Sequence, residues 1–228
     1  MRIDLISAVP DLMRSPIENS IIKRARESGH VEIVLHDLHD YTTDKHGRID
    51  DYAYGGGAGM VMTPQPIFDC VESLKTERDY GEIIFTAPDG DAFTQQEANR
   101  LSLVENIIIL CGHYKGVDQR VRDSVITREY RIGDVVLSGG ELPALMMVDA
   151  VVRLIPGTLG DSESALDDAF MDGLLAAPEY TRPAVYRGMK VPEVLQSGDH
   201  SKITRWKEEQ AIGKTRRLRP DLMEKFEN

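Results

Sequence analysis

The sequence predicts an α/β domain built on a largely parallel sheet, followed by a small, mainly helical C-terminal domain. Two observations support this fold class. Up to residue 156, short apolar segments alternate with longer amphipathic segments, and strands that alternate with helices form parallel sheets covered on both faces. After residue 157 the apolar periodicity gives way to small and acidic residues, and then to basic ones, which indicates a second unit.

The individual elements follow from apolar periodicity and from helix start signals. Runs of β-branched and other apolar residues predict strands over residues 3–9, 31–35, 82–86, 106–111 and 125–131. Helices are predicted over residues 10–29, 64–74, 94–103, 141–154, 201–212 and 220–226. Pro10 suits a helix start, and Thr94 with Glu97 forms a capping box. Residues 40–62 are polar and then glycine-rich, so no regular element fills this stretch.

The composition is that of a soluble globular protein, with 228 residues, 41% of them hydrophobic and 29% charged. We expect a cytoplasmic protein without a membrane partner, because no leader follows Met1 and no apolar run reaches about 20 residues. Cys70 and Cys111 lie in apolar surroundings and indicate no disulfide framework. His36 and His39 have the spacing of a metal pair, but no carboxylate or cysteine cluster joins them, so no metal site is predicted.

The net charge of −11 argues at first against a nucleic-acid partner. The charge is unevenly distributed, however. Residues 182–228 hold 11 Lys and Arg against 7 Asp and Glu, a net charge of +4, which leaves 16 basic and 31 acidic residues, a net of −15, for the remainder. A basic tail on an acidic body can contact phosphates, because the local potential decides contact. From charge alone, a solvated surface explains the tail somewhat better than a nucleic-acid partner does.

Three glycine-bearing segments, residues 54–60, 111–116 and 132–141, each lie where a strand or irregular stretch gives way to a helix. Glycine lets backbone N–H groups approach a ligand closely, and the carboxyl ends of parallel strands form the binding crevice of such sheets. A tight turn explains one such segment as well as a ligand does. Three in one domain predict a ligand site. Neither a dinucleotide fingerprint nor a Walker motif is present.

These segments resemble the bacterial tRNA (guanine-N1)-methyltransferases of the SPOUT class. The similarity extends from residue 1 to about residue 222, and the eight-residue run 137–144 is too long to arise by coincidence. The matching segments are residues 49–51, 54–60, 111–114, 132–144, 153–157, 173–175, 180–183, 191–192 and 195–200.

The resemblance implies a parallel sheet whose C-terminal part is threaded into a deep trefoil knot, a rare exception among protein chains. It divides the chain into a knotted, cofactor-binding methyltransferase domain (1–158), a flexible linker (159–172) and a tRNA-binding domain (173–228). It also implies an antiparallel homodimer whose active sites take residues from both subunits. S-adenosylmethionine is expected to bind in a bent form against Pro88, Gly112, Tyr114, Ile132, Gly133, Asp134, Val136, Leu137, Gly139 and Gly140.

The reaction itself needs a base and a cation. Guanine N1 carries a proton that must leave as the methyl group arrives, and the negative charge that shifts to O6 is stabilised by a nearby cation. The resemblance assigns these roles to Asp168 and Arg153, and it makes the guanine immediately 3′ of the anticodon the target. From the pattern alone, Asp168 is one of several solvated acids and Arg153 is a side chain that extends to solvent.

The substrate residues fall into two groups. His46 and Asp50 match the family's guanine-reading loop, and Tyr54 in the first glycine-bearing segment is added to them. In the basic C-terminal region we expect Arg182, His200 and Arg205 to contact phosphates and bases, whereas Trp206 suits base stacking and core packing equally. The predicted partners are tRNA and a second copy of the chain; no DNA partner is expected.

The chain departs from the family at a few positions. Lys115 stands where the family usually has a glutamate, and the Mg²⁺ dependence of the family is tied to this neighbourhood. Two sets of cofactors therefore remain: S-adenosylmethionine alone, and S-adenosylmethionine with Mg²⁺. Val135 replaces a usual tyrosine. Two alternatives remain: a SPOUT enzyme for another RNA, and a catalytically weak relative that binds RNA or cofactor. A small-molecule methyltransferase leaves the basic C-terminal region without a role.

Overall fold

The computed structural model describes residues 1–159, 169–170 and 173–227. The chain divides into two compact units, unit 1 (Met1–Ser162) and unit 2 (Glu163–Asn228). Most of the predicted linker 159–172 lies outside the described residues, so the predicted boundaries at 158 and 173 remain predictions. Within the described part of the chain, no helix is long and apolar enough to cross a membrane.

Unit 1 is built on a five-stranded sheet in the order β2-β1-β6-β5-β7, and every neighbouring pair is parallel. This confirms the predicted α/β class. The strands are β1 (Arg2–Ser7), β2 (Glu32–Asp37), β5 (Glu82–Ala92), β6 (Asn106–Cys111) and β7 (Arg128–Arg131). Within the irregular stretch 40–62, a short antiparallel hairpin joins β3 (Asp50–Tyr52) to β4 (Met60–Met62).

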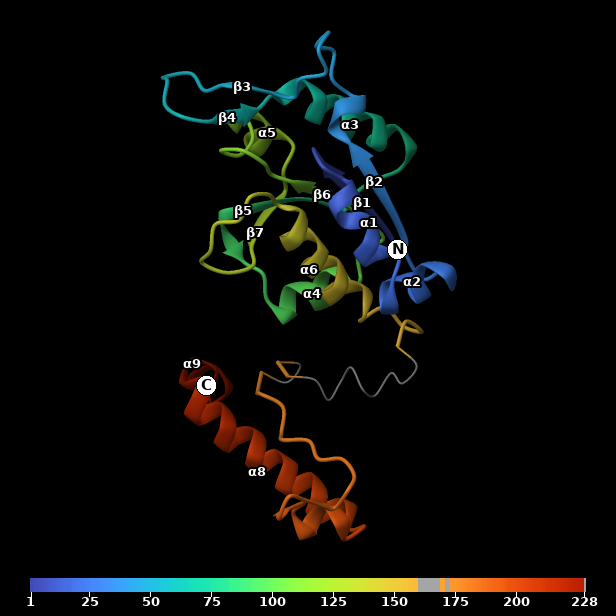
Figure 1. Ribbon diagram of the computed structural model, residues 1–228, viewed down its shortest axis with the longest axis vertical. Helices are drawn as coiled ribbons and strands as arrows, with labels where there is room; N and C mark the ends of the chain where they lie inside the picture. The colour runs from blue at the N-terminus through green and yellow to red at the C-terminus, as the bar shows by residue number, and fades with distance from the viewer. Residues whose placement is uncertain (160–168, 171–172, 228) are drawn as a thin grey trace. The chain divides into compact units, whose positions relative to one another are not determined.

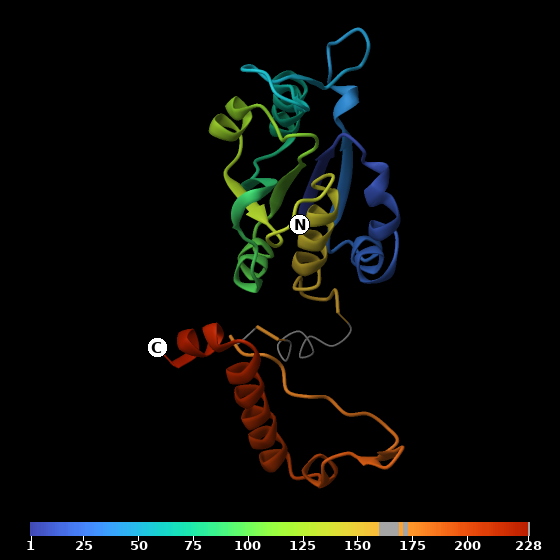
Figure 2. The ribbon, with the colours of Figure 1, turned by 60° about the vertical axis from the view of Figure 1, so that its left-hand side comes forward.

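Helices cover both faces of this sheet (Figures 1 and 2). Ile3 and Leu5 of β1 belong to one core cluster and Ile6 to the other, as expected because successive strand side chains point to opposite faces. The first cluster includes residues of α1 (Asp11–Ile17), α2 (Ser20–Glu27), α4 (Gln95–Leu101) and α6 (Glu141–Val152). The second includes residues of α3 (Pro64–Glu77) and α5 (Gln119–Ser124).

The predicted single helix over residues 10–29 is wrong. The chain forms α1 and α2 instead, and Ser20, the first residue of α2, has a φ of +56°, a left-handed conformation that interrupts a right-handed helix. Pro16 in α1 also lacks the N–H needed to continue the hydrogen-bond ladder. Strand β5 runs six residues beyond the predicted end at residue 86, with a register shift between Thr86 and Asp91. Helix α5 was not predicted.

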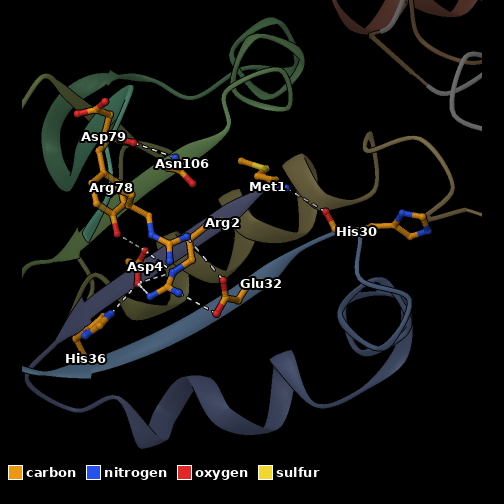
Figure 3. Close-up of polar contacts among 10 residues, drawn as sticks. Met1, Arg2, Asp4, His30, Glu32, His36, Arg78, Asp79 and Asn106 are labelled. Atoms are coloured by element: carbon orange, nitrogen blue, oxygen red, sulfur yellow. Dashed lines mark hydrogen bonds and ion pairs between the residues drawn. The ribbon is translucent and has the colours of Figure 1, made fainter. Parts of the chain in front are cut away.

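A buried carboxylate joins the strands at the β1–β2 side of the sheet (Figure 3). Asp4 has no exposed surface. It accepts hydrogen bonds from Arg2 Nε (2.9 Å), His36 Nε2 (2.8 Å) and Tyr80 Oη (2.7 Å). Burial raises the pKa of Asp4, but these hydrogen bonds outweigh burial and lower it to about 2. Asp4 is therefore held as a carboxylate by donors on three segments of the chain.

Unit 2 contains the hairpin strands β8 (Val185–Tyr186) and β9 (Met189–Lys190), a 3₁₀ turn η2 (Glu193–Gln196), and helices α8 (His200–Leu218) and α9 (Pro220–Glu227). Both predicted C-terminal helices are confirmed, and α8 is longer than predicted. Asp199 caps α8 by accepting a hydrogen bond from the N–H of Lys202. The preceding extended segment is fastened to α8, because the buried Thr215 hydroxyl accepts from the N–H of Leu175 at 2.8 Å.

Candidate functional site

A cavity of about 400 Å³ opens at the carboxyl end of the sheet in unit 1. Its walls come from residues 85–89 of β5, residues 112–116 after β6, and residues 130–133 and 135–140 from the end of β7 to the start of α6, with Arg122 and Pro143. This volume is typical of small-molecule sites, and parallel sheets bind ligands at this edge. Two of the three glycine-bearing segments therefore meet at one cavity.

Nine of the ten predicted cofactor residues line this cavity: Pro88, Gly112, Tyr114, Ile132, Gly133, Val136, Leu137, Gly139 and Gly140. Asp134 does not line it. The Asp134 side chain is 90% exposed and forms an ion pair with Arg131 at 3.0 Å. The structure thus brings together residues that are up to 52 positions apart, from Pro88 to Gly140, although their contact with a cofactor remains a prediction.

The loop over residues 133–137 presents groups that suit a ligand with both polar and apolar parts. Its backbone N–H and C=O groups form no hydrogen bond with another described residue. Val135, Val136 and Leu137 are 61%, 86% and 46% exposed, which is unusual for large apolar side chains that line a cavity. A Cβ at Gly133 would meet nothing within 4 Å. The loop is therefore open to a ligand rather than packed against the protein.

The glycines at 139 and 140 have a different role from Gly133. A Cβ at Gly139 would overlap the His113 ring and the Glu141 carboxylate, and one at Gly140 would overlap Thr86 Oγ1. The Gly140 N–H also donates to Gly112 O at 2.7 Å. These two glycines let the protein's own loops pack together, whereas the sequence suggested direct approach to a ligand.

A buried network beneath the cavity was not predicted. Glu141, at the first position of α6, is 1% exposed. Ser7 Oγ donates to Glu141 Oε1 at 2.5 Å, and His113 Nε2 lies 2.9 Å from both carboxylate oxygens. His113 Nε2 thus faces both carboxylate oxygens, which is the geometry of a ring N–H that donates to a carboxylate. This network joins the end of β1, the loop after β6 and the start of α6.

The cations of the cavity wall differ in their surroundings. Arg122 forms ion pairs with Glu129 and with Asp89, the latter at 2.9 Å, and its hydrogen bond lowers the pKa of Asp89. Lys115 forms no ion pair with the described residues. Its stem lies against the first glycine-bearing segment, because a Cβ at Gly59 would be 2.9 Å from Lys115 Cε. Lys115 thus adds an uncompensated positive charge to the cavity wall.

The predicted substrate residues are divided between the two units. Asp50 lies at the start of β3. The pKa of Tyr114 is raised, first by burial of its side chain and then by the charge and hydrogen bond of Asp50. His46 and Tyr54 are exposed, and Tyr54 is fully so. In unit 2, the structure leaves Arg182, His200 and Arg205 exposed. Trp206 is partly buried, with its ring centroid 6.4 Å from that of Tyr180.

The predicted catalytic pair is described in part. Asp168 lies outside the described residues. Arg153 directly follows α6, partly buried, with its N–H donating to Asp149 O at 3.2 Å. The roles of both residues therefore remain predictions.

No group of three or more potential metal-ligating side chains occurs among the residues that the structure describes. The two histidines with metal-like spacing have separate acidic partners. His36 contacts Asp4 at 2.8 Å, and His39 contacts Asp37 at 2.7 Å.

Comparison with known proteins identifies the family. A family model described as tRNA (guanine-1)-methyltransferase TrmD matches residues 1–225. The chain belongs to this family. Proteins named tRNA (guanine-N(1)-)-methyltransferase are similar over nearly their full length: that of Flavobacterium johnsoniae is 60% identical, over 98% of this chain and 99% of its own. Those of Bacteroides fragilis and Chlorobium luteolum are 57% and 54% identical, over 98% of this chain and 100% and 96% of their own.

Proposed function

We propose that this chain transfers the methyl group of S-adenosylmethionine to N1 of the guanine immediately 3′ of the tRNA anticodon. The observation that carries the proposal is family membership over residues 1–225. Family members are tRNA (guanine-N1)-methyltransferases, so tRNA as substrate and S-adenosylmethionine as methyl donor follow from the class. The position of the guanine rests on the resemblance in sequence.

The cavity in unit 1 fits the cofactor. The unpaired backbone groups of residues 133–137 suit the polar edge of an adenine base, and the exposed Val136 and Leu137 suit its faces. When bound, S-adenosylmethionine supplies an electrophilic methyl group on a sulfonium centre. The residues around it exclude water and orient the guanine.

Asp168 removes the N1 proton of guanine, and Arg153 stabilises the negative charge that develops on O6. The chemistry of the step supports this division, because proton loss from N1 and charge on O6 occur together. We include the trefoil knot in the proposal on the strength of the family's SPOUT class.

An exposed apolar patch supports the homodimer. Leu12 of α1 is 57% exposed, and Leu142 and Met146 of α6 are each 56% exposed. Residues 142 and 146 are four apart and so lie on one face of α6, and α6 packs against α1. A second copy would cover this patch, as the resemblance to an antiparallel dimer implies.

The deciding experiment is single-turnover methylation of an unmodified tRNA transcript with labelled S-adenosylmethionine, with and without Mg²⁺, followed by mapping of the modified base. Methyl on N1 of the guanine 3′ of the anticodon is expected. Asp168→Asn should reduce the rate by at least a hundredfold while cofactor affinity stays within about twofold. Methyl at another position favours a different RNA target, and binding without transfer favours the catalytically weak relative.

Lys115 determines which Mg²⁺ result is expected. A cation in the cavity wall repels a divalent ion, so transfer should be nearly independent of Mg²⁺. Lys115→Glu is the matched variant, because it restores the charge sign usual in the family. A rate that depends on Mg²⁺ in the unaltered protein would contradict this part of the proposal.

A further inference from the structure

The β8–β9 hairpin of unit 2 exposes apolar side chains that no described element covers. Its register pairs Tyr186 with Met189 and Val185 with Lys190. Paired residues point to the same side of a two-stranded ribbon, so Tyr186 and Met189 form one face. Tyr186 is 56% exposed and Met189 66% exposed. A soluble protein rarely leaves an aromatic and a methionine side by side in water without a partner.

The turn of this hairpin holds an arginine in a position that favours glycine. Arg187 and Gly188 have φ values of +50° and +81°, as a two-residue turn of type I′ requires. A left-handed conformation is sterically unfavourable for arginine, and folding alone would favour Asn or Gly. The Arg187 guanidinium lies over the Tyr186 ring, 5.3 Å from its centroid, so the turn places a cation on one face of the exposed ring.

The charge around the hairpin has one sign. Between residues 180 and 192 the chain has three basic residues, Arg182, Arg187 and Lys190, and no acidic one. None of the three forms an ion pair with a described residue. On α8, by contrast, Lys202 pairs with Asp199 at 2.9 Å and Lys207 pairs with Glu179 at 3.1 Å. Three cations without an ion-pair partner among the described residues thus lie within residues 182–190, at or beside the hairpin.

We propose that the β8–β9 hairpin binds an unpaired segment of the tRNA substrate, with a base stacked on the Tyr186–Met189 face and neighbouring phosphates held by Arg187, Lys190 and Arg182. The proposal rests on the proposed function, which supplies the RNA. Aromatic rings flanked by cations are the usual means by which proteins hold unpaired nucleotides, because every base has a face to stack and every linkage has a negative charge.

The first test measures binding of the full-length protein to a fluorescently labelled, unmodified tRNA transcript by anisotropy. Tyr186→Ala should weaken binding about tenfold, because stacking of one base is lost. Tyr186→Phe keeps the ring and should bind within about twofold of the unaltered protein. Neither change should alter the dependence of affinity on salt. Equal affinity for the alanine variant would overturn the proposal.

Arg187→Gly separates recognition from folding. A φ of +50° is sterically less strained for glycine than for arginine, so the hairpin should fold at least as well. The variant should nevertheless bind tRNA several-fold more weakly, and the slope of log affinity against log salt should become shallower by about 0.7, as for one lost phosphate contact. If Arg187 served the fold, Arg187→Gly would bind at least as tightly as the unaltered protein.

Matched controls locate the effect. Lys202→Gln removes a cation of unit 2 that already has a partner, and it should change affinity less than twofold. In methylation assays, the hairpin variants should raise KM for tRNA with kcat within about twofold.

Absence of methyl transfer by the unaltered protein would refute the proposed function. The binding comparison would then still decide whether the hairpin binds RNA. Unchanged tRNA binding with lost binding to phosphatidylserine vesicles would overturn the RNA proposal in favour of a membrane surface.

Discussion

Strand β1 takes part in two buried carboxylate networks that look alike and serve different regions. Asp4 and Ser7 lie on opposite faces of the strand, because they are three positions apart and successive side chains alternate between the faces. Asp4 is itself the carboxylate of the first network, and Ser7 donates to the carboxylate of the second, Glu141. Both carboxylates are at most 1% exposed. The networks differ in what they connect.

The Asp4 network connects strands. Its donors Arg2 and His36 lie on β1 and β2, Tyr80 lies just before β5, and none of them lines the cavity. The Glu141 network connects the end of β1 to the cavity wall, since His113 lines the cavity and Glu141 begins α6 beside Gly139 and Gly140. Burial and pairing alone therefore do not reveal whether a charged group supports the stability of the fold or the shape of a site. The elements that it joins decide this.

The largest expected effect is on stability, at Asp4. Asp4→Asn keeps the shape but leaves the Arg2 guanidinium buried beside a neutral group, and should lower the free energy of unfolding by about 3 kcal/mol. Affinity for S-adenosylmethionine should stay within about twofold, because no member of this network reaches the cavity. Urea unfolding and isothermal titration calorimetry measure the two quantities. Glu32→Gln is the matched control: Glu32 also pairs with Arg2, but its side chain is 59% exposed, so the loss should be under about 1 kcal/mol.

The second expected effect is acid sensitivity from the same carboxylate. The pKa of Asp4 is lowered from 3.8 to about 2 in the folded protein. The stabilisation is therefore fully present above pH 4 and is lost as the pH falls towards 2. Between pH 5 and pH 2 the unaltered protein should lose about 2 kcal/mol more stability than Asp4→Asn, by the same linkage. Parallel losses in the two proteins would show that Asp4 titrates normally.

The third expected effect concerns the Glu141 network. Gly139→Ala places a methyl group against the His113 ring and the Glu141 carboxylate, and should destabilise the protein by about 1–2 kcal/mol. Unlike Asp4→Asn, it should also weaken cofactor binding, because the shifted groups border the cavity. Gly213→Ala in α8 is the control, since a Cβ there meets nothing within 4 Å and helix propensity favours alanine. A loss of stability without loss of cofactor affinity would place Gly139 with the Asp4 type of network.

The sequence predicted the sheet well because its strands are strongly apolar. Strand β6 has the predicted bounds, since Ile107 to Cys111 are all buried, as in parallel strands covered on both faces. Short elements whose stability comes from tertiary contacts were missed. Helix α5 has six residues and a single buried one, Val121, and no periodicity can emerge from so short a segment. The break at Ser20 depends on a left-handed residue that the helical apolar pattern conceals.

The candidate site was predictable in outline and not in its supports. Residues near the carboxyl ends of β5, β6 and β7 converge by the rules of parallel sheets, so glycine-bearing segments marked the cavity. The contact between His113 and Glu141 joins residues 28 positions apart, and no local sequence pattern predicts such a contact. One signal was available: Glu141 is a charged residue at the start of an otherwise apolar helix, where a buried carboxylate needs donors.

The smallest expected effect is the one that best separates the two networks. Glu141→Gln keeps the size of the side chain and the contact with Ser7, but its NH₂ group replaces the second carboxylate oxygen that faces His113 Nε2. The ring must then change tautomer or turn. Affinity for S-adenosylmethionine should fall about tenfold, as for a displaced wall of the cavity, while stability changes by about 1 kcal/mol or less. In ¹⁵N NMR, the His113 ring should show its proton moving away from Nε2.

This pattern is the reverse of the one expected for Asp4→Asn, where stability falls and affinity is kept. Glu27→Gln, at an exposed carboxylate that pairs with Lys23 at 3.7 Å, should change neither quantity. If Glu141→Gln instead lowered stability as much as Asp4→Asn and left cofactor affinity intact, Glu141 would be a second structural anchor of β1. The distinction between a network that joins strands and one that positions a site would then fail for this protein.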